Sequence, residues 1–115
     1  MQLAISVTAP MSEIGTIVDL ARNTHDIEDV SEPSTLDADR ALNAAITLDE
    51  VKTVLEIVTA VFKSGAALIE FMKAVRETMR ARRAAVVVSD PLTGKRLGRI
   101  EADTSDETLA EFLVR

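Results

Sequence analysis

A chain of 115 residues, 47% of them hydrophobic, suits a single folded domain over residues 1–115 and is too apolar for a disordered tail. Cysteine is absent, which excludes disulfides, thiolate catalysis and cysteine-bound zinc. The net charge of −6 argues against a general nucleic-acid-binding protein, since such domains are usually basic.

The charge is unevenly distributed along the chain. Residues 1–71 carry 4 basic and 12 acidic side chains, whereas residues 72–99 carry 8 basic and 2 acidic ones. Residues 100–115 are acidic again, with 1 basic and 5 acidic side chains. We therefore expect a local basic surface on an otherwise acidic protein.

The first 24 residues predict a strand followed by a helix. Leu3, Ile5 and Val7 alternate with small or polar residues, as in a strand with one buried and one solvated face. Pro10 suits the first turn of a helix, because its missing N–H would be unpaired there. Asn23–Thr24 is the expected helix end. Before it, apolar residues recur at helical spacing, namely Ile14, Ile17, Val18 and Ala21.

Residues 25–46 carry weaker patterns. Ile27 and Val30 predict a short strand over residues 27–31. Residues 32–35, Glu-Pro-Ser-Thr, predict a loop, and residues 36–46 are compatible with a loose helix or an ordered linker.

Residues 47–83 carry the strongest pattern. Thr47 and Glu50 have the spacing of a capping box at a helix start. Apolar residues then follow in alternating steps of three and four, which is typical of a helix. This aliphatic stripe consists of Val51, Val54, Val58, Val61, Leu68, Met72, Val75 and Met79, with Gly65 at one of its positions.

A straight helix over residues 47–83 would be about 55 Å long at 1.5 Å per residue, which is long for a compact domain of this size. Ser64–Gly65 is a typical break site, so we expect two helices broken near Gly65. Gly65 should then adopt a backbone angle that suits only glycine, and the stripe should form the core. The alternative is a straight helix whose stripe forms a homo-oligomer seam.

The rest of the chain predicts a hairpin and a short helix. Residues 85–88 and 97–102 are the expected strands, and the turn at 90–94 contains Pro91 and Gly94. Residues 104–107 cap a helix that carries Leu109, Phe112 and Leu113 on one face. The expected fold class is α+β: a small, largely antiparallel sheet, made of the N-terminal strand and the C-terminal hairpin, covered by helices on one face.

The sequence suggests no membrane or export signal. The apolar stretch at 54–75 contains four charged residues, which excludes an ordinary membrane span. The first residues lack the basic and apolar regions of a signal peptide. The cytoplasm is therefore the expected location, and no membrane partner is expected.

No group of residues has the spacing of a catalytic, metal or cofactor site. His25 is the only histidine and is expected at the surface, and the acidic run at 26–32 lacks the spacing of a calcium loop. Residues 90–95 end in Gly-Lys but lack the first glycine of a phosphate loop. Glu101 and Asp103 cannot be assigned as an acid–base pair from the sequence alone, because that assignment requires the geometry of the two carboxylates. We therefore expect no catalytic, metal-binding or cofactor-binding residue, and we expect that the protein is not an enzyme.

Basic side chains gather at the end of the predicted helical region and on the hairpin. They are the candidate partner-binding residues, namely Arg76, Arg80, Arg82, Arg83, Lys95, Arg96 and Arg99. The functional interpretation is a contact with an acidic protein surface, or an internal contact with the acidic N-terminal half. The simpler interpretation is that these charges complement the helix dipole and keep the protein soluble.

Several segments together suggest a family. They are the strand and helix at 3–21, the small-residue element at 64–67, the basic helix end at 80–83, the strand and turn at 85–94, and the helix from Ser105. Their order and texture resemble the effector-associated constant component domains of bacteria, although residues 25–46 fit that pattern less well. Those domains are small non-enzymatic modules encoded in predicted conflict or immunity systems.

The resemblance implies an adaptor that joins an effector to a sensor or to itself, with no catalytic residue or cofactor. An alternative is a regulatory inhibitor or antitoxin-like subunit, which would mask a basic enzyme surface with the acidic N-terminal half.

Overall fold

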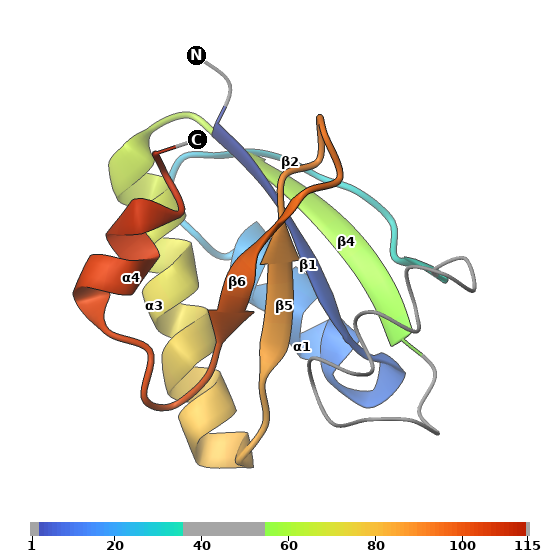
Figure 1. The fold of residues 1–115 in the computed structure, drawn as a ribbon. Coiled ribbons are helices and arrows are strands. Elements are labelled where there is room, and N and C mark those ends of the chain that lie inside the picture. Colours follow the sequence, from blue (N-terminus) through green and yellow to red (C-terminus); the bar gives the residue numbers. More distant parts are fainter. Residues whose placement is uncertain (1–2, 36–54, 115) are drawn as a thin grey trace.

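The computed structural model describes residues 3–35 and 55–114. In chain order these residues form β1 (Leu3–Pro10), α1 (Met11–Arg22), β2 (Ile27–Val30), β3 (Ser34–Thr35), β4 (Leu55–Phe62), α3 (Gly65–Arg82), β5 (Val86–Ser89), β6 (Arg96–Ile100) and α4 (Asp106–Glu111) (Figure 1). The expected α+β class is confirmed.

The strands form one antiparallel sheet in the order β2-β4-β1-β5-β6, and the short β3 also pairs with β4. β1 lies in the centre, where it pairs with β4 over its whole length and with β5 on its other side. The crossover through α1 passes over β4, and the crossover through α3 passes over β1. This is the ferredoxin-like, split β-α-β arrangement, extended at one edge by β6 and α4.

One face of the sheet packs against the helices (Figure 1). The strand register places Val7 beside both Val58 and Val88 on this face, and all three are buried in the core. The Phe62 ring on β4 lies 5.2 Å from the Phe71 ring on α3, measured between centroids. The helices add further buried side chains, including Ile14 and Ile17 from α1 and Leu68, Met72, Val75 and Met79 from α3.

The opposite face of the sheet, which we call the second face, differs from the prediction at β1. Ser6 and Thr8 were expected in solvent, but they are only 2% and 4% exposed. The Ser6 hydroxyl lies 2.8 Å from the Thr59 hydroxyl on β4. A strand in the centre of a sheet can thus satisfy a polar side chain through its neighbour strand instead of through water.

The predicted helix before Ser64 is wrong in the part that the structure describes, because residues 55–62 form β4. Four of these eight residues are β-branched, namely Ile57, Val58, Thr59 and Val61, and such residues favour strands. The predicted start of that helix at Thr47–Glu50, the stripe residues Val51 and Val54, and all of residues 36–46 lie outside the described residues.

The predicted break near Gly65 is confirmed, but it separates a strand from a helix. Ser64 has extended backbone angles, and its hydroxyl accepts a hydrogen bond from the Ala67 N–H at 3.2 Å, as an N-cap does. Gly65 is the first residue of α3, and its φ is not positive. The expectation that only glycine fits there is therefore wrong, because the capping serine makes the boundary.

The C-terminal elements follow the prediction. The hairpin turn places Gly94 at φ 74°, and the Asp90 N–H donates to the Lys95 carbonyl across the turn. The Ser105 hydroxyl caps α4 by accepting from the Thr108 N–H at 3.1 Å. The ring of Phe112 lies directly against Gly98 of β6, which fixes α4 beneath the hairpin.

The short strand expected at 27–31 is also present as β2, whereas the loop expected at 32–35 contains β3.

Candidate functional site

The end of α3 positions four of the seven candidate basic residues. Arg76, Arg80 and Arg82 lie in its last two turns, and Arg83 ends it in the left-handed backbone region with φ 53°. The Ala84 N–H then donates to the Met79 carbonyl at 3.0 Å, which closes the helix. Positive charges at a helix C-terminus complement its dipole, but these four side chains differ in the contacts they make.

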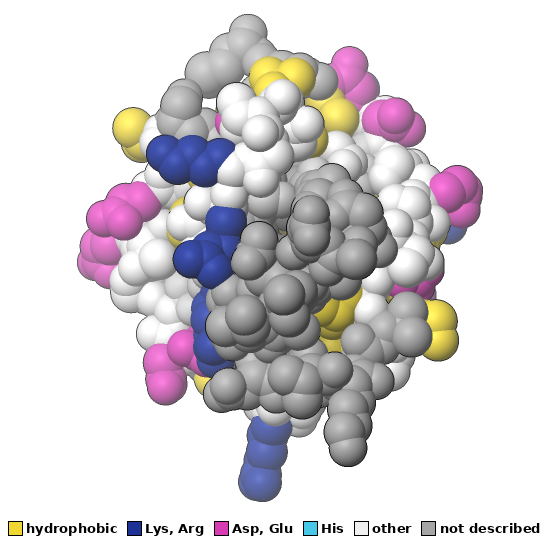
Figure 2. Space-filling view, turned by 45° about the vertical axis from the view of Figure 1, so that its right-hand side comes forward, with side chains coloured by type: hydrophobic (Ala, Val, Ile, Leu, Met, Phe, Trp, Pro, Cys, Tyr) yellow, Lys and Arg dark blue, Asp and Glu magenta, His cyan; other side chains and the backbone are white. Residues whose placement is uncertain are grey.

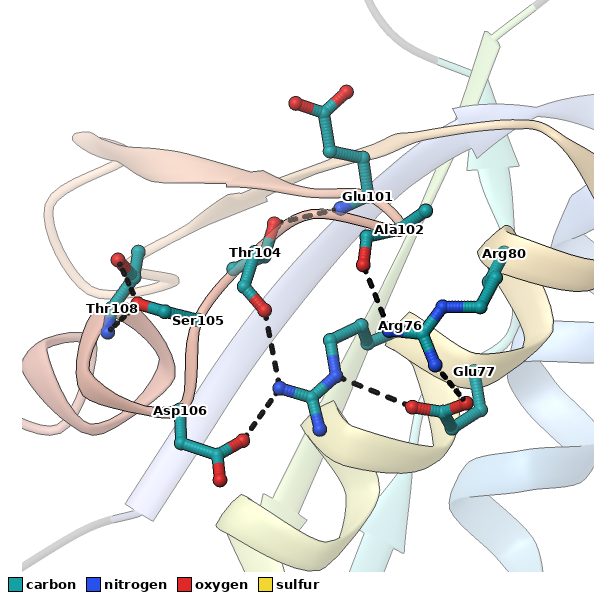
Figure 3. A network of polar contacts seen from close by, with 9 residues as sticks. All are labelled: Arg76, Glu77, Arg80, Glu101, Ala102, Thr104, Ser105, Asp106 and Thr108. Carbon is teal, nitrogen blue, oxygen red and sulfur yellow. Dashed lines mark hydrogen bonds and ion pairs between the residues drawn. The ribbon is translucent and has the colours of Figure 1, made fainter.

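Arg76 is committed to a contact between α3 and α4 (Figure 3). Its side chain is only 14% exposed. One guanidinium nitrogen, Nη1, donates to the Thr104 carbonyl at 3.1 Å and to the Asp106 carboxylate at 2.5 Å. Its Nε lies 3.5 Å from the carboxylate of Glu77. Arg76 therefore holds the start of α4 in place, and it is not presented to a partner.

The charges in this contact shift each other's titration. The hydrogen bond from Arg76, together with the nearby charge of Lys73, lowers the pKa of Asp106. The hydrogen bond to Asp106 raises the pKa of Arg76 despite the opposing effect of desolvation. Both side chains remain charged at neutral pH, so this ion pair belongs to the folded protein under ordinary conditions.

Arg80 and Arg82 also make internal contacts, although both are about half exposed. Arg80 pairs with Glu77 at 2.7 Å and donates to the Ala102 carbonyl at 3.0 Å (Figure 3). Arg82 lies 3.1 Å from the carboxylate of Glu13 and donates to the Thr16 hydroxyl at 3.1 Å. Arg80 thus joins α3 to the loop after β6, and Arg82 joins it to α1.

The remaining four residues are Arg83, at the end of α3, and three residues on or next to β6, namely Lys95, Arg96 and Arg99. Arg96 and Arg99 are opposite Ser89 and Val87 of β5, and the register places all four on the second face. Arg99 forms an ion pair with Glu101. Within the part of the chain that the structure describes, the exposed side chains of Arg83 and Lys95 have no hydrogen bond or ion pair.

We call Arg83, Lys95, Arg96 and Arg99 the basic strip. Figure 2 shows Lys and Arg side chains following one another along one side of the molecule. The structure therefore brings four of the seven candidates to one region, and it assigns the other three to contacts within the fold. The internal contact expected with the acidic N-terminal half is present at Arg82, whose partner Glu13 belongs to α1.

A cavity of about 290 Å³ lies at one end of the basic strip. Arg83 and Arg99 line it together with Glu101 and Asp103, and Met79 and Pro10 contribute apolar surface. Side chains of both charges therefore meet there. Sequence reasoning grouped the two arginines but gave no weight to the two acidic residues, because only the fold brings them to the same cavity.

The other polar residues singled out in the sequence are surface residues. The His25 side chain is 84% exposed and lies 3.6 Å from the Asp26 carboxylate. Glu28, Asp29 and Glu32 are exposed on β2 and the segment after it. Among residues 3–35 and 55–114, no cluster of three or more His, Asp or Glu side chains could hold a metal ion. No helix in those ranges combines the length and hydropathy that a membrane crossing requires.

Comparisons with known proteins identified no relative of this chain. The chain matches no family model, no curated protein and no solved structure.

Proposed function

We propose that this chain is a non-catalytic protein-interaction module that couples an effector to a sensor or another partner in a bacterial conflict or immunity system. The basic strip carries the proposal. It places exposed cations on the edge strand β6 and at the end of α3 in an otherwise acidic protein, and such a surface attracts an acidic partner over a distance. The resemblance to effector-associated constant component domains supplies the biological setting.

Arg83 and Lys95 give the sharpest test of this role. Reversing both to Glu removes positive charge from the strip without breaking a contact within the described fold. Arg80 and Arg82 are poorer choices, because their reversal would also break contacts to Glu77 and Glu13. A matched control is Lys63→Glu with Lys73→Glu, which makes the same change in net charge on exposed residues elsewhere.

The experiment has two steps. Proteins cross-linked to the purified wild-type chain in an extract of its source bacterium are identified, and the recovered partner is then purified. Its association rate with the Arg83→Glu, Lys95→Glu variant should fall by about tenfold at low salt, because surface charges act mainly on association. The control should bind as the wild type does. Equal rates for both variants across a salt series would contradict the proposal.

The exposed acidic residues of β2 favour a second candidate, a regulatory inhibitor or antitoxin-like subunit. Glu28 and Asp29 could face a basic surface on a partner enzyme. In that case Glu28→Lys with Asp29→Lys would abolish inhibition of the enzyme, whereas reversal of Arg83 and Lys95 would leave it unchanged. Measuring the activity of the recovered partner with each variant separates the two candidates.

A further inference from the structure

The two outer strands of the sheet carry opposite charges. β2 and β6 end the strand order, and among the described residues no strand pairs with the outer side of either. The acidic edge, on and around β2, contains the exposed residues Asp26, Glu28, Asp29 and Glu32. The basic edge, on and before β6, contains the exposed residues Lys95, Arg96 and Arg99.

Each edge also contains residues of the other sign nearby, but they do not reverse its character. Arg22 lies 3.9 Å from Glu32, and Glu101 pairs with Arg99 just after β6 ends. The acidic edge therefore retains Glu28 and Asp29, for which no ion pair occurs among the described residues. The basic edge retains Lys95, whose side chain also forms no ion pair among the described residues.

The directions of the two edge strands are compatible with a continuous sheet. β2 and β1 are both antiparallel to β4, so β2 runs in the same direction as β1. β6 and β1 are both antiparallel to β5, so β6 also runs in that direction. If β6 of one copy lies beside β2 of another in the same orientation, the strands pair in parallel and the helices remain on one face.

The charges select between the ways in which two copies can meet. A two-fold pairing of β6 with β6 would bring arginines together, and a two-fold pairing of β2 with β2 would bring carboxylates together. Like charges on paired strands are destabilising, whereas opposite charges are favourable. Register places Asp29 on the second face, where Arg96 and Arg99 also lie, so β6 against β2 brings unlike charges to the same face.

We propose that a second copy of this chain docks its acidic β2 edge against the basic β6 edge, which gives head-to-tail self-association. Such a contact joins two different surfaces, so it propagates into a ring or an open chain of copies and does not stop at a dimer. The paired strands are only four and five residues long, so association is weak and depends on the charges. The inference deepens the proposed interaction role by naming one partner, the chain itself.

Charged residues and bulges at edge strands also serve in many proteins to prevent pairing, and both edges here contain a register shift. The two explanations differ in one measurable respect. Edges that only prevent pairing keep the protein monomeric at every salt concentration. Edges of opposite sign associate at low salt and separate when salt screens their charges.

Sedimentation velocity on the intact chain, from micromolar to millimolar concentration, provides the test. At about 20 mM salt the sedimentation coefficient should rise with concentration, and at about 500 mM it should return to the monomer value, because screening shortens the reach of the charges. A basic-edge variant, Arg96→Glu with Arg99→Glu, should remain monomeric at low salt. An acidic-edge variant, Glu28→Lys with Asp29→Lys, should do the same.

Mixing these two variants is the decisive step. The first has two acidic edges and the second has two basic edges, so each edge finds an opposite one only in the other variant. An equimolar mixture should regain the self-association of the wild type. Control variants with the same changes in net charge, on exposed residues of α3 and α4, should associate as the wild type does; they are Lys73→Glu with Ala66→Glu and Ala110→Glu, and Glu107→Lys with Glu111→Lys. Circular dichroism checks that all variants are folded.

A wild type that remains monomeric at low salt and millimolar concentration would overturn the inference, without recourse to any variant. Association that does not respond to salt, or a mixture that remains monomeric while the wild type associates, would overturn it as well, because another surface would then be responsible. None of these results affects the association rates with a captured partner, so failure of self-association and failure of the adaptor proposal remain distinguishable.

Discussion

β4 and α3 are consecutive parts of the same aliphatic stripe, yet one is a strand and the other a helix. Both carry apolar residues in steps of three and four. In α3 that spacing places Leu68, Met72, Val75 and Met79 on one buried face, as expected for a helix. In β4 the buried core residues are Val58, Ala60 and Phe62, which follow the period of two.

The difference teaches that spacing alone does not determine the type of element when the apolar run is nearly continuous. A run such as residues 54–62 satisfies both periods, so residue type and boundaries must decide. β4 is rich in β-branched residues, whereas α3 contains the helix-favouring residues Ala, Leu, Met, Glu, Lys and Arg. Ser64 separates the two with a helix cap.

Truncating the aromatic contact between the two regions should have the largest effect. Phe62 of β4 and Phe71 of α3 are 2% and 1% exposed, and their rings touch. Phe62→Ala and Phe71→Ala should each lower the free energy of unfolding by about 3–5 kcal/mol, because each leaves a cavity in the core. Denaturant unfolding measures both, and the double variant should reveal a coupling of about 0.5–1.5 kcal/mol. Strictly additive losses would show that the two regions do not stabilise each other through this contact.

β6 and α4 form a second contact between a strand and a helix, in which Phe112 packs against Gly98. A methyl group added to Gly98 would lie 2.9 Å from Cε1 of Phe112, which is too close. Gly98→Ala should therefore lower the free energy of unfolding by about 1–3 kcal/mol through overpacking. Phe112→Leu in the same background should recover part of the loss by making room. A Gly98→Ala variant as stable as the wild type would mean that α4 moves freely over β6.

The boundary between β4 and α3 should respond to Ser64 and Gly65 in opposite directions. Ser64→Ala removes the cap of the Ala67 N–H and should cost about 1 kcal/mol. Gly65→Ala should leave stability unchanged or raise it by up to about 1 kcal/mol, since alanine restricts the unfolded chain and its methyl group would lie 3.8 Å from Leu113, an ordinary contact. Thermal unfolding of both variants at several protein concentrations measures the effects. A loss from Gly65→Ala as large as that from Ser64→Ala would assign the boundary to the glycine.

The outer side of α3 should show the smallest effect, as a dependence on pH. The pKa of Asp106 is lowered in the folded state by Arg76, so the pair stabilises the fold above the ordinary value of 3.8. That contribution is lost as the pH falls through the lowered value. Acid unfolding of Asp106→Asn should therefore be less steep below about pH 4 than that of the wild type. Glu107→Gln on the same helix is the matched control. Parallel acid-unfolding curves for the wild type and Asp106→Asn would contradict this role of the ion pair.

The candidate site could be predicted only in part. Composition and order indicated a basic group near the end of α3 and on the hairpin, and Arg83, Lys95, Arg96 and Arg99 do lie in one region. The same pattern included Arg76, whose partners Thr104 and Asp106 come 28 and 30 residues later in the chain. A partner so distant in sequence depends on how α4 packs against α3, so the loss of Arg76 to an internal contact could not be anticipated from local pattern.

The sequence by itself determined the elements whose signals are local. The alternation of β1, the spacing along α1, the left-handed glycine of the hairpin turn and the serine cap of α4 all act within a few residues, and each element formed where its pattern predicted. Only the tertiary structure decided which strands residues 55–62 pair with and that Ser6 is buried. Both depend on β1 lying between β4 and β5, because a strand acquires its hydrogen-bond partners and its buried faces from neighbours that are distant in sequence. The same strand order places the acidic and basic edges at opposite ends of one sheet.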